Sequence, residues 1–330
     1  MKIAVVILNW NGAGLLRRFL PSVVAHSPQA AIYVADNAST DDSIAVLEAE
    51  FPSVRIIKND KNYGFAGGYN EALKKVDAQV FALVNSDIEV TENWLAPIVS
   101  AFENDSALAI VQPKILDYKN KDYFEYAGAA GGFIDKYGYP FCRGRLFDTL
   151  EKDHAQYNDD VAIFWASGAC MFIRSDVYRK LGGFDGDFFA HQEEIDLCWR
   201  AFNLNHKARY IAQSVVYHVG GATLQQGSPR KTFLNFRNSL LMLLKNLPFS
   251  RLLPIIFARL CLDGVAGIQF AWQGKITHTM AIVNAHFSFY GALSKTYRKR
   301  GDRQVGEYYK VNGIVYNYFV KKRRKFTELF

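Results

Sequence analysis

The chain has 330 residues, of which 50% are hydrophobic and 22% are charged, a composition typical of a folded protein with a substantial core. Its formal net charge of +7 is uneven, because residues 226–330 hold 18 basic and 4 acidic side chains while residues 1–225 hold 21 and 28. The basic back part suggests an anionic partner, either a membrane surface or a nucleic acid. The cysteines show no C-x-x-C spacing, which argues against a disulfide scaffold or zinc site and fits a reducing, cytoplasmic compartment.

Strands and helices alternate over the first 112 residues, the pattern of βαβ units around a parallel sheet. The expected strands cover residues 2–8, 31–35, 54–57, 79–84 and 108–112, and the expected helices cover residues 13–25, 41–50, 66–76 and 92–104. The first strand starts directly after Lys2, so we expect no signal peptide.

Three of these strands end in short polar clusters, which are Asn9-Trp10-Asn11, Asp36-Asn37 and Asn85-Ser86-Asp87. Ligands of an open parallel sheet bind outside the carboxyl ends of its strands, so the three clusters are expected to form one site. Asp36 can accept the N3–H of a uracil or thymine, and Asp87 can ligate Mg²⁺ or Mn²⁺. Taken alone, the cluster at Asp36 is explained at least as well by a turn and helix N-cap, and Asn85-Ser86-Asp87 equally well by a turn that ends the strand.

A glycine-rich run, N-Y-G-F-A-G-G-Y-N, covers residues 62–70 and leads into a helix. Glycine lets backbone N–H groups approach a ligand closely, which makes Asn62, Gly64, Gly67 and Asn70 candidate binding residues. A tight loop also needs glycine, so this run alone is a weak signal.

The middle of the chain has a less regular pattern. Residues 113–160 are rich in Gly, Tyr and Phe and predict loops with a few antiparallel strands. The next expected elements are a buried strand or strand pair at 161–173, a helix near 175–181, a turn at Gly182-Gly183, a helix starting near Glu193 and strands near 208–218. From about residue 229 the pattern is helical and basic, and we place a domain boundary near residue 225.

Three carboxylates lie within four residues at the start of the helix expected near Glu193. Glu193, Glu194 and Asp196 precede the apolar run Leu197-Cys198-Trp199, which indicates a packed helix. Crowding and burial raise the pKa of a carboxyl group, so this segment predicts a general base. The alternative is a solvated helix start in which the acids complement the helix dipole and Asp196 pairs with Arg200.

His218 closes an expected strand and is followed by Val219-Gly220-Gly221. A lone histidine is often structural, and this one is equally suited to be a further metal ligand. Beyond it, the apolar stretch 252–272 contains Pro254, Arg259 and Asp263, which argues against a membrane-spanning helix and leaves an interfacial helix open.

Together these motifs resemble the glycosyltransferase family 2 proteins of GT-A fold, in particular the bacterial rhamnosyltransferase-like branch. The resemblance covers about residues 1–245 and is carried, in order, by V-V-I-L-N-W-N-G, V-A-D-N-A-S-T-D, N-x-G-F-A-G-G-x-N, N-S-D, F-F-x-x-x-E-E-x-D-L-C-W-R, Y-H-x-G-G and F-L-N-x-R-N. It implies an α/β fold, with a mostly parallel Rossmann-like sheet flanked by helices over residues 1–225 and a basic, mainly helical region over 226–330.

The resemblance also implies a nucleotide-sugar donor, a divalent cation (Mg²⁺ or Mn²⁺) and inversion at the anomeric carbon. By analogy, Asp36 would contact the pyrimidine, Asp87 and His218 would hold the metal, and the acidic pair would supply the base. The other candidate donor-binding residues are Asn9, Asn11, Asn37, Asn62, Gly64, Gly67, Asn70, Asn85 and Ser86. Two positions depart from the family pattern, because its usual Glu-Asp pair is Glu193-Glu194 here and the first residue of its Asp-x-Asp motif is Asn85.

The expected mechanism is a single in-line displacement. Glu194 takes the proton of an acceptor hydroxyl as the oxygen attacks the sugar C1, while Glu193 and Asp196 position the acceptor or Glu194. The branch suggests rhamnose from dTDP-rhamnose, with UDP-linked hexoses open, and an acceptor hydroxyl on a growing, lipid-linked cell-envelope saccharide. The basic region would then rest on the anionic inner face of the cell membrane. A solvated basic face and an oligomer surface are the alternatives.

Other classes of protein remain open from the sequence alone. Gly12 and Gly14 follow the first strand as in a dinucleotide-dependent oxidoreductase, although Arg17 stands where the third glycine is expected. A nucleic-acid-binding protein would use the basic back part, but the chain has no recognisable binding motif, and we expect no nucleic-acid partner. Asn85 and Glu194 also leave open a degenerate transferase that binds donor without transferring sugar.

Overall fold

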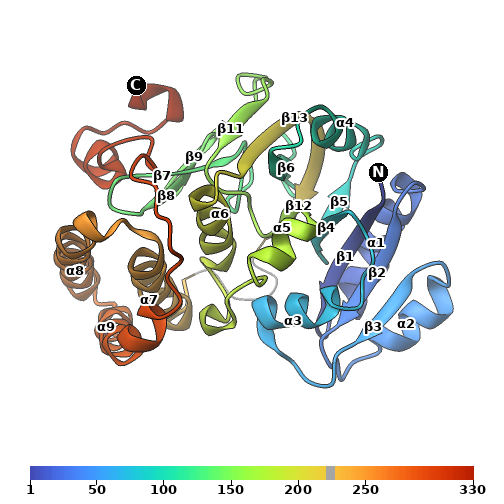
Figure 1. Cartoon of the computed structure of the whole chain (residues 1–330), viewed down its shortest axis with the longest axis horizontal. Helices are drawn as coiled ribbons and strands as arrows, with labels where there is room; N and C mark the ends of the chain where they lie inside the picture. The colour runs from blue at the N-terminus through green and yellow to red at the C-terminus, as the bar shows by residue number, and fades with distance from the viewer. Residues whose placement is uncertain (221–226) are drawn as a thin grey trace.

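The computed structural model describes residues 1–220 and 227–330, so Gly221 and the predicted boundary near residue 225 lie outside the described residues. A nine-stranded sheet with helices on its two faces forms the body of the molecule, and three long helices lie beside it (Figure 1). The strand order is β11-β13-β6-β12-β4-β1-β2-β3, with β5 paired to β13.

The first half of the sheet is built from parallel βαβ units, as predicted. Its elements are β1 (Ile3–Asn9), α1 (Ala13–His26), β2 (Ala31–Asp36), α2 (Ser43–Glu50), β3 (Arg55–Lys58), α3 (Gly64–Leu73) and β4 (Val80–Asn85). β1 lies between β2 and β4 and is parallel to both. Val5 and Ile7 point into one core cluster and Ala4 and Val6 into the other, so β1 is apolar throughout because both faces are covered by helices.

The second half of the sheet is mixed. It contains β5 (Ile88–Val90), α4 (Ala96–Asn104), β6 (Leu108–Asp117), β11 (Val161–Ile163), β12 (Cys170–Arg174), α5 (Ser175–Lys180), α6 (Glu193–Asn203) and β13 (Lys207–His218). β12 is antiparallel to both β4 and β6 and separates them. β6 runs five residues beyond the predicted end at residue 112, because β13 pairs with it as far as Asp117.

A small antiparallel sheet occupies the irregular region 113–160, in agreement with the predicted loops and short strands. Its strands are β7 (Gly132–Ile134), β8 (Pro140–Cys142), β9 (Arg145–Leu146) and β10 (Thr149–Leu150). The end of the chain returns to this sheet through η2 (Tyr316–Val320) and η3 (Phe326–Leu329). There the backbone N–H of Phe326 donates to Glu151 at 3.1 Å, and the hydroxyls of Tyr318 and Thr149 lie 2.8 Å apart.

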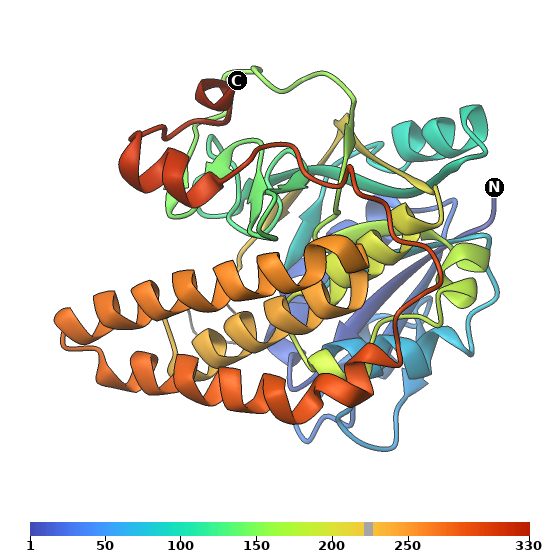
Figure 2. The same ribbon diagram turned by 60° about the vertical axis from the view of Figure 1, so that its left-hand side comes forward.

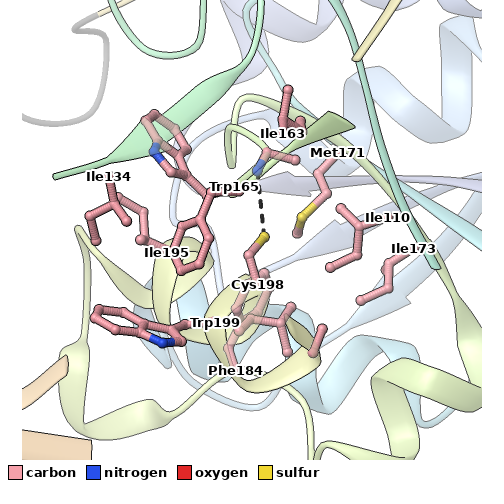
Figure 3. Close-up of a cluster of buried hydrophobic side chains, with 14 of the residues drawn as sticks. Ile110, Ile134, Ile163, Trp165, Met171, Ile173, Phe184, Ile195, Cys198 and Trp199 are labelled. Atoms are coloured by element: carbon pink, nitrogen blue, oxygen red, sulfur yellow. Dashed lines mark hydrogen bonds between the residues drawn. The ribbon is translucent and has the colours of Figure 1, made fainter. Parts of the chain in front are cut away.

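Helix α6 is anchored by the apolar cluster in Figure 3. Its residues Ile195, Cys198 and Trp199 are at most 2% exposed and pack in the same core cluster as Met171 of β12. The Sγ of Cys198 accepts a hydrogen bond from the backbone N–H of Ala166 at 3.4 Å. All four cysteines are free thiols, in agreement with the prediction of no disulfide scaffold.

The C-terminal part is helical, as predicted, with α7 (Pro229–Asn246), α8 (Phe249–Trp272) and α9 (Ile276–Tyr297). Ser228 caps α7 by accepting the N–H of Lys231, and Pro229 occupies the first helical position. In Figure 2, α8 and α9 run side by side and are joined by a tight turn far from the N-terminus. Among the described helices, α8 alone is long and apolar enough to cross a membrane, and only 28% of its most apolar window is buried.

Candidate active site

The ends of β1 and β2 bring the first two polar clusters together. Asn9 and Asp36 are opposite each other in the parallel register and are 0% and 3% exposed. The Nδ2 of Asn9 donates to Oδ1 of Asp36 at 3.0 Å, and the N–H of Ser39 donates to Oδ2 at 2.9 Å. Each carboxylate oxygen has a second lone pair, so Asp36 keeps capacity to accept a further hydrogen bond from a ligand.

Asn37 organises the loop before α3. Its Nδ2 donates to Oδ1 of Asn62 at 2.9 Å and to the carbonyl of Gly64 at 3.1 Å, while its Oδ1 accepts from Asn59 and from the N–H of Tyr63. Gly64 has a φ of +71°, and a Cβ there would lie 3.0 Å from the ring of Phe189. The start of α3 therefore requires glycine for its backbone and for close packing.

Three other candidate donor-binding residues are also placed by the structure. Asn11 accepts the N–H of Thr40 at 2.7 Å and so fixes the loop after β2. Gly67 packs against Tyr63, inside the first turns of α3. Ser86 is half-buried beside β4 and is outside the lining of the cavity described below.

The prediction that Asn70 binds the donor needs correction, because its side chain forms hydrogen bonds on the side away from the strand ends. Its Nδ2 donates to the carbonyl of Phe184 at 2.8 Å, and its Oδ1 accepts from the hydroxyl of Tyr178 and the N–H of Phe184. Asn70 lies one and a half helical turns beyond Gly64, so it points toward the segment before α6 and joins α3 to it.

The third cluster meets the end of β13. Oδ1 of Asp87 lies 3.1 Å from Nε2 of His218, and Oε1 of Glu125 lies 3.3 Å from Nδ1 of the same ring. Burial lowers the pKa of His218, but Glu125 and Asp87 outweigh this effect and raise the pKa to about 10. Burial raises the pKa of Asp87, but the hydrogen bond and charge of His218 outweigh it and hold that pKa below its usual value.

Gly220 makes the contact between His218 and Glu125 sterically possible. Its φ is +71°, and a Cβ at this position would lie 2.9 Å from Oε1 of Glu125. The space beside His218 that Gly220 leaves open is therefore used by a carboxylate from the loop after β6. Glu125 was missed because it is a single acid in a stretch without periodicity.

The residues at this end fit a divalent cation that shares its coordination with a substrate. Within residues 1–220 and 227–330, no group of three or more His, Cys, Asp or Glu side chains is arranged to hold an ion. Oδ1 of Asp87 and Nε2 of His218, 3.1 Å apart, are the two atoms that would hold the ion, once the ring has given up its Nε2 proton. Asn85, whose Nδ2 lies 3.4 Å from Nε2 of His218, carries a further amide oxygen.

A cavity of about 640 Å³ connects this end of the site with α6. Asn85, Asp87, His218, Glu193 and Glu194 line it, together with side chains of the small sheet, α7 and α8. Asn9, Asp36 and Asn37 lie outside its lining, at the neighbouring strand ends of the same sheet. The structure therefore places the candidate metal ligands and the acidic pair around one space.

Each member of the acidic pair has an enclosed, unpaired oxygen. Glu193 is buried, at 5% exposed, and Glu194 is half-buried. Within the described part of the chain, one carboxyl oxygen of each glutamate has no hydrogen-bond partner. Burial raises the pKa of Glu194 to about 7. Burial and the charge of Glu194 raise the pKa of Glu193 well above its usual value. Such carboxyls can accept or hold a proton near neutral pH.

The predicted role of Asp196 in positioning the acceptor or Glu194 also needs correction, because its side chain points away from the cavity. Its side chain accepts hydrogen bonds from Arg200, Lys245 and Asn246, each at 2.8 Å. Burial raises its pKa, but Lys245 and Arg200 outweigh burial and lower the pKa overall. Residues two apart on a helix lie on nearly opposite sides, so Glu194 and Asp196 cannot face the same site. Asp196 joins α6 to α7.

The segment before α6 is strained and is held by α7. Phe189, His191 and Gln192 have φ values of 64°, 69° and 73°, which non-glycine residues seldom adopt. The Nδ2 of Asn238 lies within hydrogen-bond distance of the carbonyls of Phe188, Ala190 and His191, at 2.8–2.9 Å. The sequence motif F-L-N-x-R-N had no assigned role. Its last residue, Asn238, holds the segment that leads into the acidic pair.

His191 also lines the cavity, although the sequence did not single it out. Its Nε2 is buried without a partner among the residues described, and burial lowers its pKa to about 4. The ring is therefore neutral at physiological pH. A neutral imidazole beside Glu193 can donate to or accept from a sugar hydroxyl.

Comparisons with known proteins agree with this arrangement. The family model described as Glycosyl transferase family 2 matches residues 4–182. The N-acetylglucosaminyl-diphospho-decaprenol L-rhamnosyltransferase of Mycobacterium tuberculosis is 24% identical over 234 residues, which cover 65% of this chain and 75% of the relative.

Solved structures share the fold at lower identity. The structure of S. aureus TarS 1-349 in complex with UDP-GlcNAc has a TM-score of 0.59 and 14% identity, covering 91% of this chain and 84% of that one. The mannosyltransferase PcManGT from Pyrobaculum calidifontis, in complex with GDP-Man and Mn²⁺, has a TM-score of 0.55 and 13% identity, covering 88% and 87%. The fold is that of the GT-A glycosyltransferases, which sets aside the dinucleotide-dependent oxidoreductase. The chain belongs to glycosyl transferase family 2.

Proposed function

We propose that this glycosyltransferase moves a sugar, with inversion, from a nucleotide-sugar donor to a hydroxyl of a lipid-linked cell-envelope saccharide. The observation that carries the proposal is the acidic pair Glu193-Glu194, which shares one cavity with Asp87 and His218. A proton acceptor and a site for a departing diphosphate are the two parts that a single displacement needs.

In the proposed mechanism, the oxygen of the acceptor hydroxyl bonds to the sugar C1 while ionised Glu194 accepts the proton of that hydroxyl. The bond from C1 to the diphosphate oxygen breaks at the same time, and the nucleoside diphosphate leaves. Glu193, whose pKa is raised by burial and by the charge of Glu194, donates a hydrogen bond when protonated and so orients the acceptor or Glu194. Asp87 and His218 would hold a divalent cation, which when bound neutralises charge on the diphosphate.

The proposed donor is a pyrimidine nucleotide sugar, with dTDP-rhamnose as the first choice and UDP-hexoses as the next. Asp36 is a buried acceptor at the end of β2 that can take the N3–H of thymine or uracil. Support for rhamnose comes from the mycobacterial relative, which is named as an L-rhamnosyltransferase. TarS was crystallised with UDP-GlcNAc and PcManGT with GDP-Man and Mn²⁺, so the fold accommodates other bases and sugars.

The proposed place of action is the inner face of the cytoplasmic membrane. Large apolar side chains recur every three or four residues along α9, and along α8 except for a gap between Phe257 and Val265, so each helix presents exposed apolar side chains. On α8 these are Phe249, Leu253, Phe257, Val265, Ile268 and Trp272, and on α9 Ile276, Met280, Val283, Phe287, Tyr290, Leu293 and Tyr297, all at least 38% exposed. Lysines and arginines of the same region attract anionic lipid, each by about 1 kcal/mol near the surface. Contiguous apolar surface with cations is typical of interfacial helices.

Calorimetric titration with dTDP, UDP, GDP and NAD, each with and without Mn²⁺, tests the donor class. We expect dTDP or UDP to bind tightly only with the metal. Transfer to a lipid-linked saccharide is then assayed with dTDP-rhamnose and UDP-hexoses. Tight NAD binding, or no nucleotide binding under either condition, would refute the proposal.

A further inference from the structure

Two cations line the active-site cavity without an acidic partner. Arg145, on β9, is 7% exposed, and its guanidinium contacts the carbonyl of Phe147 and the Sγ of Cys142, each at 3.4 Å. It lies over the ring of Tyr126 at 4.6 Å. Its Nε has no hydrogen-bond partner, and no carboxylate lies within 4.0 Å of the guanidinium, in residues 1–220 and 227–330.

Lys231, on α7, faces the same cavity and also lines an adjoining space of about 410 Å³. Burial lowers the pKa of its ammonium group, and no ion pair is formed with any carboxylate that the structure describes. Residues 221–226, with the sequence G-A-T-L-Q-Q, contain no acidic side chain that could pair with either cation.

The other buried cations of this chain are paired, which makes the buried Arg145 exceptional, while Lys231 is half-buried. Lys114 lies 2.8 Å from Asp153, and Lys245 lies 2.8 Å from both Asp185 and Asp196. Arg143, two residues before Arg145, contacts Asp159 at 2.5 Å. Burying a charge without a partner is costly, so an unpaired buried cation that lines a cavity indicates an anionic ligand.

We propose that Arg145 and Lys231 form a phosphate-binding subsite of the active-site cavity. The guanidinium fork matches phosphate oxygens, and the ammonium group adds a point charge. Because the proposed substrates are phosphate esters, the source of the phosphate rests on the proposed function. It is either the diphosphate of the donor or the phosphate that links the acceptor saccharide to its lipid.

The direct test is calorimetric titration of the full chain with inorganic pyrophosphate in EDTA, so that no metal contributes. Arg145→Gln and Lys231→Gln should each weaken binding by about tenfold or more, because each removes a charge-assisted hydrogen bond. The matched controls are Arg143→Gln, which removes a paired cation of the same hairpin, and Lys275→Gln, which removes an exposed cation outside the cavity lining. Both controls should bind pyrophosphate like the native protein.

Kinetics separates the two sources of phosphate. A higher KM for the nucleotide sugar in the Arg145 and Lys231 variants assigns the subsite to the donor. A higher KM for the lipid-diphosphate acceptor, but not for the same saccharide without phosphate, assigns it to the acceptor. Arg145→Lys keeps the charge and should recover part of the affinity, which guards against a folding defect in Arg145→Gln.

The two proposals fail in different ways. If native protein does not bind pyrophosphate, or if the variants and controls bind it equally, the subsite is refuted even when sugar transfer is observed. If pyrophosphate binds as expected but no sugar is transferred from any donor, the proposed function is refuted and the subsite stands.

Discussion

Glu193 and Glu194 are adjacent in sequence and line the same cavity, so the protonation of one affects the other. Burial raises the pKa of Glu194 to about 7, and burial together with the charge of Glu194 raises the pKa of Glu193 well above its usual value. Neighbouring carboxyls that are costly to ionise together lose their protons in two steps that belong to the pair. The pair is therefore suited to accept one proton and to hold another for a hydrogen bond.

Replacing Glu194 by Gln should reduce transfer by roughly 10²–10⁴-fold, because the amide cannot accept the acceptor proton. In the native enzyme, kcat should rise with pH through about 7 as Glu194 ionises. Single-turnover rates across pH measure both effects, and nucleotide binding serves as the control because it should be unchanged. Near-normal turnover in the Gln variant would assign the base to another residue.

The same replacement should stabilise the fold at neutral pH. The pKa of Glu194 in the folded chain, about 7, exceeds its usual value of 4.5, so folding binds protons and stability falls as pH rises between these values. Glutamine does not titrate, so the free energy of unfolding of Glu194→Gln should rise relative to that of the native protein by at most about 3 kcal/mol over this pH range. Thermal unfolding at about pH 5 and about pH 8 measures the gain, with the exposed Glu48→Gln as control. An equal difference in Tm at both pH values would contradict it.

At the residue scale, the sequence identified the chemistry better than the direction of side chains. The acidic cluster and the strand-end residues were visible because polar groups interrupt apolar runs. The pairing of Asp196 with Arg200 was one of the alternatives that the sequence offered, and the structure contains it. The contacts with Lys245 and Asn246, about 50 positions away, were not visible in the sequence. Arg145 and Glu125 gave no local signal because their neighbours follow no period.

Among the elements, α7 links the acidic pair to the rest of the molecule. Lys245 and Asn246, at its end, bond to Asp196, while Asn238, two turns earlier, bonds to the carbonyls before α6. Both ends of the segment that carries Glu193 and Glu194 are therefore held by one helix. This arrangement explains how three left-handed residues persist beside the cavity.

Replacing Asn238 by Ala should lower kcat by up to about 10²-fold, because a displacement of the general base by about 1 Å has an effect of this size. Donor binding at the strand ends should be nearly unchanged, which separates positioning from general damage. Asn203→Ala is the matched control, since this buried amide bonds to Asn246 and Val305 and has no contact with the segment before α6. Equal losses of kcat in both variants would contradict a positioning role.

The first elements were predictable because β1, β2 and β4 are buried on both faces and α1 has one apolar side. The place of β12 was not, because strand order depends on pairing between distant segments. β5, with only three residues, is too short to give a period and exists through its pairing with the end of β13. The left-handed turn before α6 was hidden because His191 and Gln192 are not residues that normally indicate one.

On the scale of the whole molecule, the charges that interrupt α8 in the sequence are turned inward. Arg259 and Asp263 are 2% and 0% exposed, and the guanidinium lies 3.8 Å from the ring centre of Tyr139. Their burial leaves the outer side of α8 apolar, which charge counting along the sequence could not reveal. The exposed apolar side chains of α8 support the proposal that this helix lies on the membrane surface.

Sedimentation with vesicles tests this proposal. The native chain should sediment with vesicles that contain anionic lipid, and less so at high salt. Leu253→Glu combined with Phe257→Glu should reduce the bound fraction, because these side chains are 75% and 70% exposed on α8. Leu204→Glu, at a 41% exposed position on the other part of the molecule, is the control. Equal binding by native protein and the double variant would contradict a membrane role for α8.

The position of β12 between β4 and β6 has a consequence for synthesis of the chain. When β6 leaves the ribosome, neither of its partners in the sheet has been made, because β12 and β13 both come later in the sequence. A nascent chain therefore carries the buried strand Leu108–Asp117 with free edges until residues 170–174 emerge. Such an edge favours aggregation, so translation of residues 118–174 is the interval in which a chaperone would be most needed.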